Sequence, residues 1–162
     1  MISPEQLRKY PYFAGISPDC LKSVAVLSEE RKFDAGDVLF EESGEFIGES
    51  KLYEKGREAS HLILVTSGEV NLSYALGIGD PVIIGSVVAG DLLGLSALIP
   101  PYQLTTTARA KDDGSAIHIE AKALRDLIDD NPELGFHLYK GVSKALMSRL
   151  QDTRVELAAT RA

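Results

Sequence analysis

The chain has 162 residues, of which 44% are hydrophobic and 25% charged, a balance typical of one folded domain rather than of a disordered chain. Its 24 acidic and 17 basic side chains give a formal net charge of -7, and no dense group of Lys or Arg interrupts it, which argues against direct nucleic-acid binding. A single cysteine, Cys20, excludes an intramolecular disulfide and a multi-cysteine metal site. Because no secretory leader or membrane-length apolar run is present, we expect a cytoplasmic protein without a membrane partner.

Two short helices are predicted in the first 30 residues. Ser3 and Ser17 each precede a proline and then an acidic residue, the pattern of a helix N-terminus. Apolar residues follow the second of these starts at helical spacing. Cys20 lies in this second helix, where we expect it to pack as a small apolar residue.

Between residues 31 and 120, short apolar runs alternate with turns that contain Gly and Asp. Many short strands of this kind are typical of a sandwich or barrel, and jelly-roll closure is a natural solution. The residues 41–53 fit this pattern less well, and Phe46-Ile47 and Leu52-Tyr53 are expected to form an additional surface hairpin. The expected barrel strands cover residues 38–40, 61–65, 70–74, 82–84, 87–88, 104–110 and 116–119.

Helical periodicity returns after Ile119. A short amphipathic helix is predicted around residues 123–128, and Asn131-Pro132-Glu133 predicts the start of a long helix that reaches about Leu157, with Asn131 as its cap. The whole chain is therefore expected to be a single domain, mainly β with flanking helices. We divide it into N-terminal helices (1–30), a β-barrel (31–120) and C-terminal helices (121–162).

Five segments carry a resemblance to a known family through their order and spacing. They are a helical lead-in at 7–16, a glycine turn at 33–40, a hairpin at 61–70, the Gly90-Asp91-Leu92-Leu93-Gly94 segment, and a strand followed by a helix start at 117–134. Together they resemble the cyclic nucleotide-binding domain of CRP/FNR-like regulators and protein kinase A regulatory subunits. The resemblance implies a double-stranded β-helix (jelly-roll) barrel with N-terminal helices and a long C-terminal helix. It also implies a cassette in which a short helix and an arginine bind the cyclic phosphate, while an acidic residue binds the ribose.

The cassette departs from this family pattern at both of its charged positions. Leu95 stands where the acid should follow Gly94, and Leu104 stands where the arginine should be. No Arg or Lys lies between Gly94 and Arg109, and Arg109 aligns outside the cassette. Because a buried phosphate needs a compensating charge, we expect cAMP and cGMP to bind poorly or not at all.

The remaining cassette residues define the candidate ligand pocket. Ser96 and Ala97 would offer backbone donors and Thr105 its hydroxyl, while Leu95 and Leu104 would close the pocket to charge. The pocket either holds an apolar or weakly anionic ligand or is filled by its own side chains. We expect no cofactor; cAMP or another small ligand is the alternative. The candidate pocket residues are Gly94, Leu95, Ser96, Ala97, Leu104 and Thr105.

Catalysis and metal binding find no support in the sequence. The chain has no Gly-x-Ser-x-Gly motif and no His-x-His pair, so neither a serine hydrolase nor a metal-dependent barrel enzyme is expected. We interpret His61, His118 and His137 as structural residues and expect no metal ligands. Because some members of the family bind haem, His137 is the first candidate for such a ligand.

The resemblance also implies a homodimer, since the long C-terminal helix pairs with its twin in the family. We predict that the dimerisation helix uses Leu138, Val142, Leu146 and Leu150, and that Val142 and Leu146 also face the pocket. The expected function is a non-enzymatic regulatory or sensor domain in signalling, or a protein-interaction module with a regulatory partner. The alternatives are a genuine cAMP or cGMP receptor, or the effector-binding part of a CRP/FNR-like transcription regulator without its DNA-binding helix-turn-helix domain.

Overall fold

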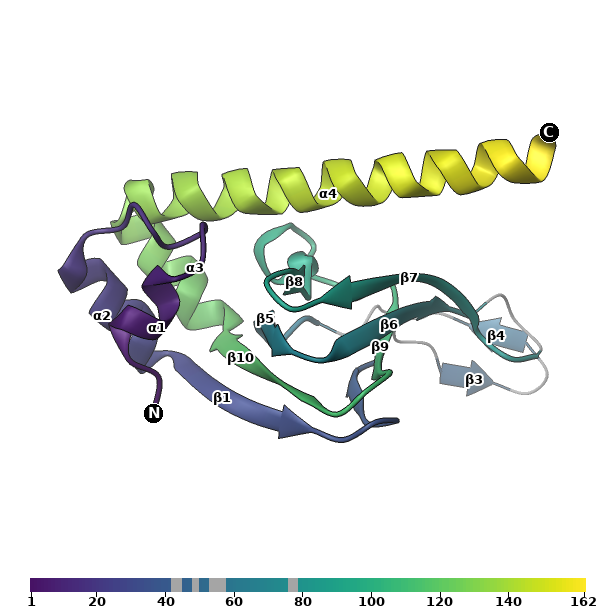
Figure 1. The fold of residues 1–162 in the computed structure, drawn as a ribbon, viewed down its shortest axis with the longest axis horizontal. Coiled ribbons are helices and arrows are strands. Elements are labelled where there is room, and N and C mark those ends of the chain that lie inside the picture. Colours follow the sequence, from purple (N-terminus) through teal and green to yellow (C-terminus); the bar gives the residue numbers. More distant parts are fainter. Residues whose placement is uncertain (42–44, 48–49, 53–57, 76–78) are drawn as a thin grey trace.

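The computed structural model describes residues 1–41, 45–47, 50–52, 58–75 and 79–162. Two antiparallel four-stranded sheets, in the orders β1-β10-β5-β8 and β2-β9-β6-β7, form the body of the molecule beside a separate β3-β4 pair. Three short helices gather at one end, and the long helix α4 runs the length of the molecule (Figure 1). The predicted class, a jelly-roll with N-terminal helices and a long C-terminal helix, is confirmed.

The strand bounds agree with most of the predicted runs. Four differ. β1 begins at Ser28, where mostly polar, exposed residues form an edge beside β10, and β9 begins at Thr107 because the preceding residues form a pocket wall. β7 is one continuous strand where two runs were predicted, and the short strand β8 was not predicted. β3 and β4 pair antiparallel within the predicted extra hairpin, of which Tyr53 and residues 42–44 and 48–49 lie outside the described residues. The strands are β1 (Ser28–Phe33), β2 (Val38–Phe40), β3 (Glu45–Ile47), β4 (Ser50–Leu52), β5 (His61–Ser67), β6 (Glu69–Tyr74), β7 (Val82–Val88), β8 (Leu92–Leu93), β9 (Thr107–Ala110) and β10 (Gly114–Glu120).

The strand β5 separates two hydrophobic clusters, which explains why its sequence is a continuous apolar run. Leu62 and Leu64 face the cluster formed with the helices, whereas Ile63 and Val65 face the cluster between the two sheets. Since successive side chains of a strand point to opposite faces, a strand buried on both faces needs apolar residues at every position. The first of these clusters ties the helical end to the barrel.

The short helices begin where their caps predict. In α1 (Pro4–Arg8), Ser3 and Gln6 form a reciprocal capping box, and in α2 (Pro18–Val26) the Ser17 hydroxyl accepts from the Cys20 N–H. Cys20 is buried in α2, as expected, and burial raises the pKa of its thiol. The other helices are the 3-10 helix η1 (Leu95–Leu98), α3 (Ala121–Asp130) and α4 (Pro132–Arg161).

The start of α4 is at the predicted place and Asn131 is its N-cap residue, as predicted, but without a capping hydrogen bond from its side chain. The Asn131 side chain does not cap α4; its amide donates to the Leu127 carbonyl at 3.0 Å and so closes the end of α3. The helix break between α3 and α4 is too short to provide separate residues for both ends, and Pro132, which needs no N–H partner, starts α4. None of the described helices combines the length and apolarity that a membrane span requires.

Candidate ligand-binding pocket

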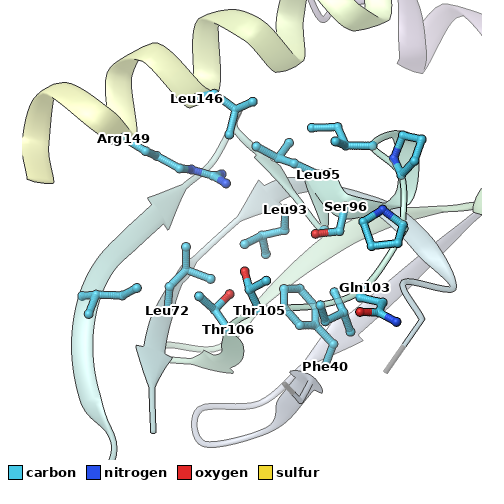
Figure 2. A pocket seen from close by; sticks show the side chains of 16 residues that line it. Phe40, Leu72, Leu93, Leu95, Ser96, Gln103, Thr105, Thr106, Leu146 and Arg149 are labelled. Atoms are coloured by element: carbon cyan, nitrogen blue, oxygen red, sulfur yellow. The ribbon is translucent and has the colours of Figure 1, made fainter. Parts of the chain in front are cut away.

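A cavity of about 390 Å³ lies where η1 and the loop after it meet β6, β7 and the distal part of α4. Its wall is largely apolar, with a few hydroxyl groups on one side and one guanidinium on the α4 side (Figure 2). This volume is at the lower end of the range for small-molecule sites. The lining residues are Phe40, Leu72, Ile84, Leu93, Gly94, Leu95, Ser96, Ile99, Pro100, Pro101, Gln103, Leu104, Thr105, Thr106, Leu146 and Arg149.

Gly94 makes the sharp turn that carries the chain from β8 into η1. Its φ is +66°, and a Cβ at this position would lie 2.7 Å from the His61 carbonyl oxygen on β5. A residue with a side chain would therefore meet both an unfavourable backbone angle and a backbone clash. This close approach to β5 places Leu95 and Ser96 in the cavity wall.

Five of the six residues predicted from the cassette, all except Ala97, line this one cavity. Leu95 and Leu104, which stand at the positions of the family's acid and arginine, are only 6% and 7% exposed and belong to the main hydrophobic cluster. The side chains of Ser96 and Thr105, joined by that of Thr106, place hydroxyls at the cavity (Figure 2). Ligand binding by these residues stays a prediction.

Ala97 does not have the predicted role of an open donor. It is fully buried and is not part of the cavity wall. Its N–H donates to the Gly94 carbonyl at 2.9 Å inside η1, and its carbonyl accepts from the Arg125 guanidinium at 2.8 Å. The tight 3-10 turn therefore uses this N–H internally.

The prediction that the pocket is closed to charge is wrong, because the Arg149 guanidinium lines it from α4. This charge comes from a helix far along the sequence, outside the segment from Gly94 to Arg109. Arg109 itself lies on β9, outside the cavity, and donates to the Gly36 carbonyl at 2.9 Å. A signal was present: Arg149 follows Leu146, which was predicted to face the pocket, by three residues, and this spacing places both on one side of a helix.

Arg149 has few hydrogen-bond partners within the part of the chain that the structure describes. Its side chain donates to the Leu92 carbonyl on β8. Burial lowers the pKa of this guanidinium, while the fields of Asp91 and Tyr12 act in the opposite direction. Within the described ranges, however, no carboxylate forms an ion pair with Arg149. A positive charge thus lies at the cavity with its compensation incomplete.

The predicted dimerisation residues divide into two groups along α4. Leu138 and Val142 are 0% and 2% exposed in the single chain and pack in its own core, so the predictions that both contact a partner and that Val142 faces the cavity are corrected. Leu146 does line the cavity, as predicted, and it is also 44% exposed. Leu150 is 43% exposed and remains available.

Two histidines that the sequence placed on separate strands prove to be neighbours. The rings of His61 on β5 and His118 on β10 meet edge to face with centroids 5.7 Å apart. His118 is buried, and burial together with Arg31 and His61 lowers its pKa to about 4. No group of three His, Cys, Asp or Glu residues suited to a metal ion occurs in the described part of the chain. His137 packs against Gly15 on the helical side, away from the cavity wall.

Comparison with known proteins identifies one protein family. The sequence model of the cyclic nucleotide-binding domain family matches residues 45–131. A solved structure from Geobacter metallireducens, described as a cyclic nucleotide-binding protein, is 35% identical with a TM-score of 0.75, and the match covers 93% of this chain and 99% of that one. No curated protein sequence matches the chain.

Two further solved structures show the fold alone, because their identities are low. The sensor domain of the transcriptional regulator DNR from Pseudomonas aeruginosa is 19% identical, with a TM-score of 0.68 over 91% of this chain and 90% of that one. The catabolite activator protein of Thermus thermophilus is 21% identical, with a TM-score of 0.64 over 93% of this chain. This chain spans 63% of the length of that activator.

Proposed function

Because the chain belongs to the cyclic nucleotide-binding domain family, we propose that it is a non-enzymatic regulatory sensor whose pocket has lost the usual means of holding a cyclic nucleotide. The observation that carries this proposal is the burial of Leu95 and Leu104 in the cavity wall. No carboxylate lines the cavity among the described residues, so a ribose hydroxyl would find no acidic acceptor there. We place the protein in the cytoplasm, with neither a membrane nor a nucleic acid as its partner.

A charged group buried without a partner of opposite charge is costly. A phosphate brought into this wall loses water, and the position that supplies a guanidinium in the family here supplies the side chain of Leu104. Removing one partner of a buried ion pair costs roughly 3–5 kcal/mol, or roughly a hundred-fold to several thousand-fold in affinity. We therefore expect cAMP and cGMP to bind at least about a hundred-fold more weakly than they bind a complete cassette.

One observation favours a second candidate function, that of a genuine cyclic-nucleotide receptor with unusual contacts. Arg149 supplies a guanidinium to the same cavity, although from α4 instead of from the cassette. In that case the phosphate would lie on the α4 side of the cavity, and affinity for cAMP would disappear in the variant Arg149→Met. The first proposal expects little cAMP binding before or after this substitution.

Calorimetric titration of the full chain with cAMP and cGMP separates the two candidates. We expect no binding in the micromolar range by the natural sequence and a clear gain of cAMP affinity in the double variant Leu95→Glu, Leu104→Arg, because it restores both charged partners. The matched control is Leu95→Gln, Leu104→Met, which changes shape similarly and adds no charge. Micromolar binding of either nucleotide by the natural sequence would contradict the proposal.

A further inference from the structure

The Arg149 side chain gives the cavity a positive charge that none of its cassette residues provides. It is the one charged side chain in the wall that the structure describes, and the rest of that wall is aliphatic, aromatic, prolyl, hydroxyl or amide. Figure 2 shows it extending from α4 toward the space between Leu95 and Leu93. A cavity of this composition accommodates an apolar body and, at one end, a group that accepts from a guanidinium.

Arg149 has hydrogen-bonding capacity to spare. A guanidinium has five N–H donors, and the Leu92 carbonyl is the one acceptor found for them within the described residues. A carboxylate could accept two parallel N–H bonds from the remaining donors, which is the arrangement that arginine favours. The hydroxyls of Ser96, Thr105 and Thr106 provide neutral donors on the other side of the cavity.

The neighbouring charges limit the ligand to a single negative charge. Arg149 also lines a groove of about 440 Å³ between β7 and α4, where Asp152 and Glu156 lie beside it. The field of Asp91 reaches Arg149 as well. These carboxylates repel a dianion such as a phosphate monoester about twice as strongly as a monoanion, and one guanidinium balances only a single negative charge.

From these observations, and resting on the proposed sensor function, we infer that the cavity binds a small carboxylic acid with an apolar body, whose carboxylate is held by Arg149 of α4. A cyclic nucleotide fits this wall less well, because its ribose hydroxyl and base present polar groups to leucines. The same residue joins the ligand to the helix, since Arg149 connects α4 to Leu92 of β8. A carboxylate bound to the remaining N–H groups of this guanidinium therefore contacts the side chain that connects α4 to the barrel.

The test uses two acids and their uncharged amides, which have nearly the same shape: octanoate with octanamide, and 4-phenylbutanoate with 4-phenylbutanamide. Each is titrated calorimetrically into the full chain. We expect at least one acid to bind about tenfold or more tightly than its amide, as a charge-assisted hydrogen bond requires. The variant Arg149→Met should remove this preference and leave amide binding unchanged.

The matched control is Arg154→Met, which removes an exposed guanidinium from the same helix and should keep the preference. The inference is overturned if neither acid binds more tightly than its amide, or if the preference survives in Arg149→Met. If Arg149→Met does not fold, Arg149→Lys is used instead, because it keeps the positive charge and must retain a preference for the acid. Loss of that preference in Arg149→Lys would also overturn the inference. If both acids and cAMP fail to bind, the inferred ligand class is wrong while the proposed loss of nucleotide binding stands. Micromolar binding of cAMP would contradict the proposed loss of nucleotide binding alone.

Discussion

His118 is a buried neutral group whose surroundings oppose its protonation. Burial lowers its pKa most, and Arg31 and His61 lower it further, whereas Glu29 acts weakly in the opposite direction. The pKa falls from 6.5 to about 4 in the folded chain. Between these values the unfolded chain takes up a proton that the folded chain refuses, so acid favours unfolding in this window. Above the upper value both states are neutral and His118 contributes nothing.

Stability is therefore expected to fall as the pH is lowered, by up to about 2 kcal/mol from this residue at a pH of about 5. The measurement is the free energy of unfolding in urea at near-neutral and acidic pH for the natural sequence and for His118→Gln, which cannot titrate. The variant should lose less stability on acidification than the natural sequence. An equal loss in both would show that His118 is not the group responsible.

Helix α4 approaches the N-terminal segment so closely that one position must be glycine. A Cβ on Gly141 would lie 2.3 Å from Cδ1 of Tyr12. The Tyr12 ring cannot easily move aside, because its hydroxyl donates to the Gly90 carbonyl at 3.0 Å and one edge faces Phe13. This contact fixes the proximal part of α4, and thereby the direction in which its distal part passes the cavity.

The substitution Gly141→Ala is expected to destabilise the chain by about 1 kcal/mol or more. In an open helix the same change stabilises by roughly 0.5–1 kcal/mol, but here overpacking costs typically 1–3 kcal/mol. In a Tyr12→Leu background the clash is relieved, so Gly141→Ala should become neutral or stabilising. Urea unfolding of the four chains completes a double-mutant cycle, and additive effects would contradict the proposed contact.

Those elements of the fold whose signal lies within a few residues could be predicted from the sequence. Caps such as Ser3 and Ser17 and the apolar run of β5 act within a few residues, and these elements were predicted correctly. Ser28 and its polar neighbours in β1 show no alternation of apolar and polar residues. Backbone pairing with β10, and not burial of side chains, places them in a strand.

The candidate site was predictable where it is contiguous in sequence and where the family resemblance extends to α4. Gly94, Leu95 and Ser96 were found as one motif and Leu146 was found on the helix, whereas Arg149 was missed. Its role depends on where residues more than 40 positions away lie in space, and its spacing from Leu146 is a weak local signal for that arrangement. For the same reason the burial of Val142 in its own core was not foreseen from an apolar stripe alone.

As a whole, the molecule consists of a packed body and a helix that extends beyond it. From Leu146 onward almost every residue of α4 is exposed apart from Arg149, and the apolar residues there include Met147 at 64%, Leu150 at 43% and Val155 at 59%. Figure 1 shows this half of the helix passing β7 toward the free C-terminal end. Apolar side chains exposed in this way favour a partner that covers this half of the helix.

We propose that the partner is a second copy of the chain, packed helix to helix through Leu146, Met147 and Leu150. The test is sedimentation velocity of the full chain and of Leu150→Asp, in which a carboxylate replaces an apolar contact. We expect the natural sequence to sediment as a dimer and the variant to dissociate, with affinity on the order of a hundred-fold weaker, because burying an unpaired charge is costly. Ser148→Asp adds the same charge to a different side of the helix and should remain dimeric. A natural chain that sediments as a monomer at high concentration would refute the dimer and would leave the exposed half of α4 to a different regulatory protein.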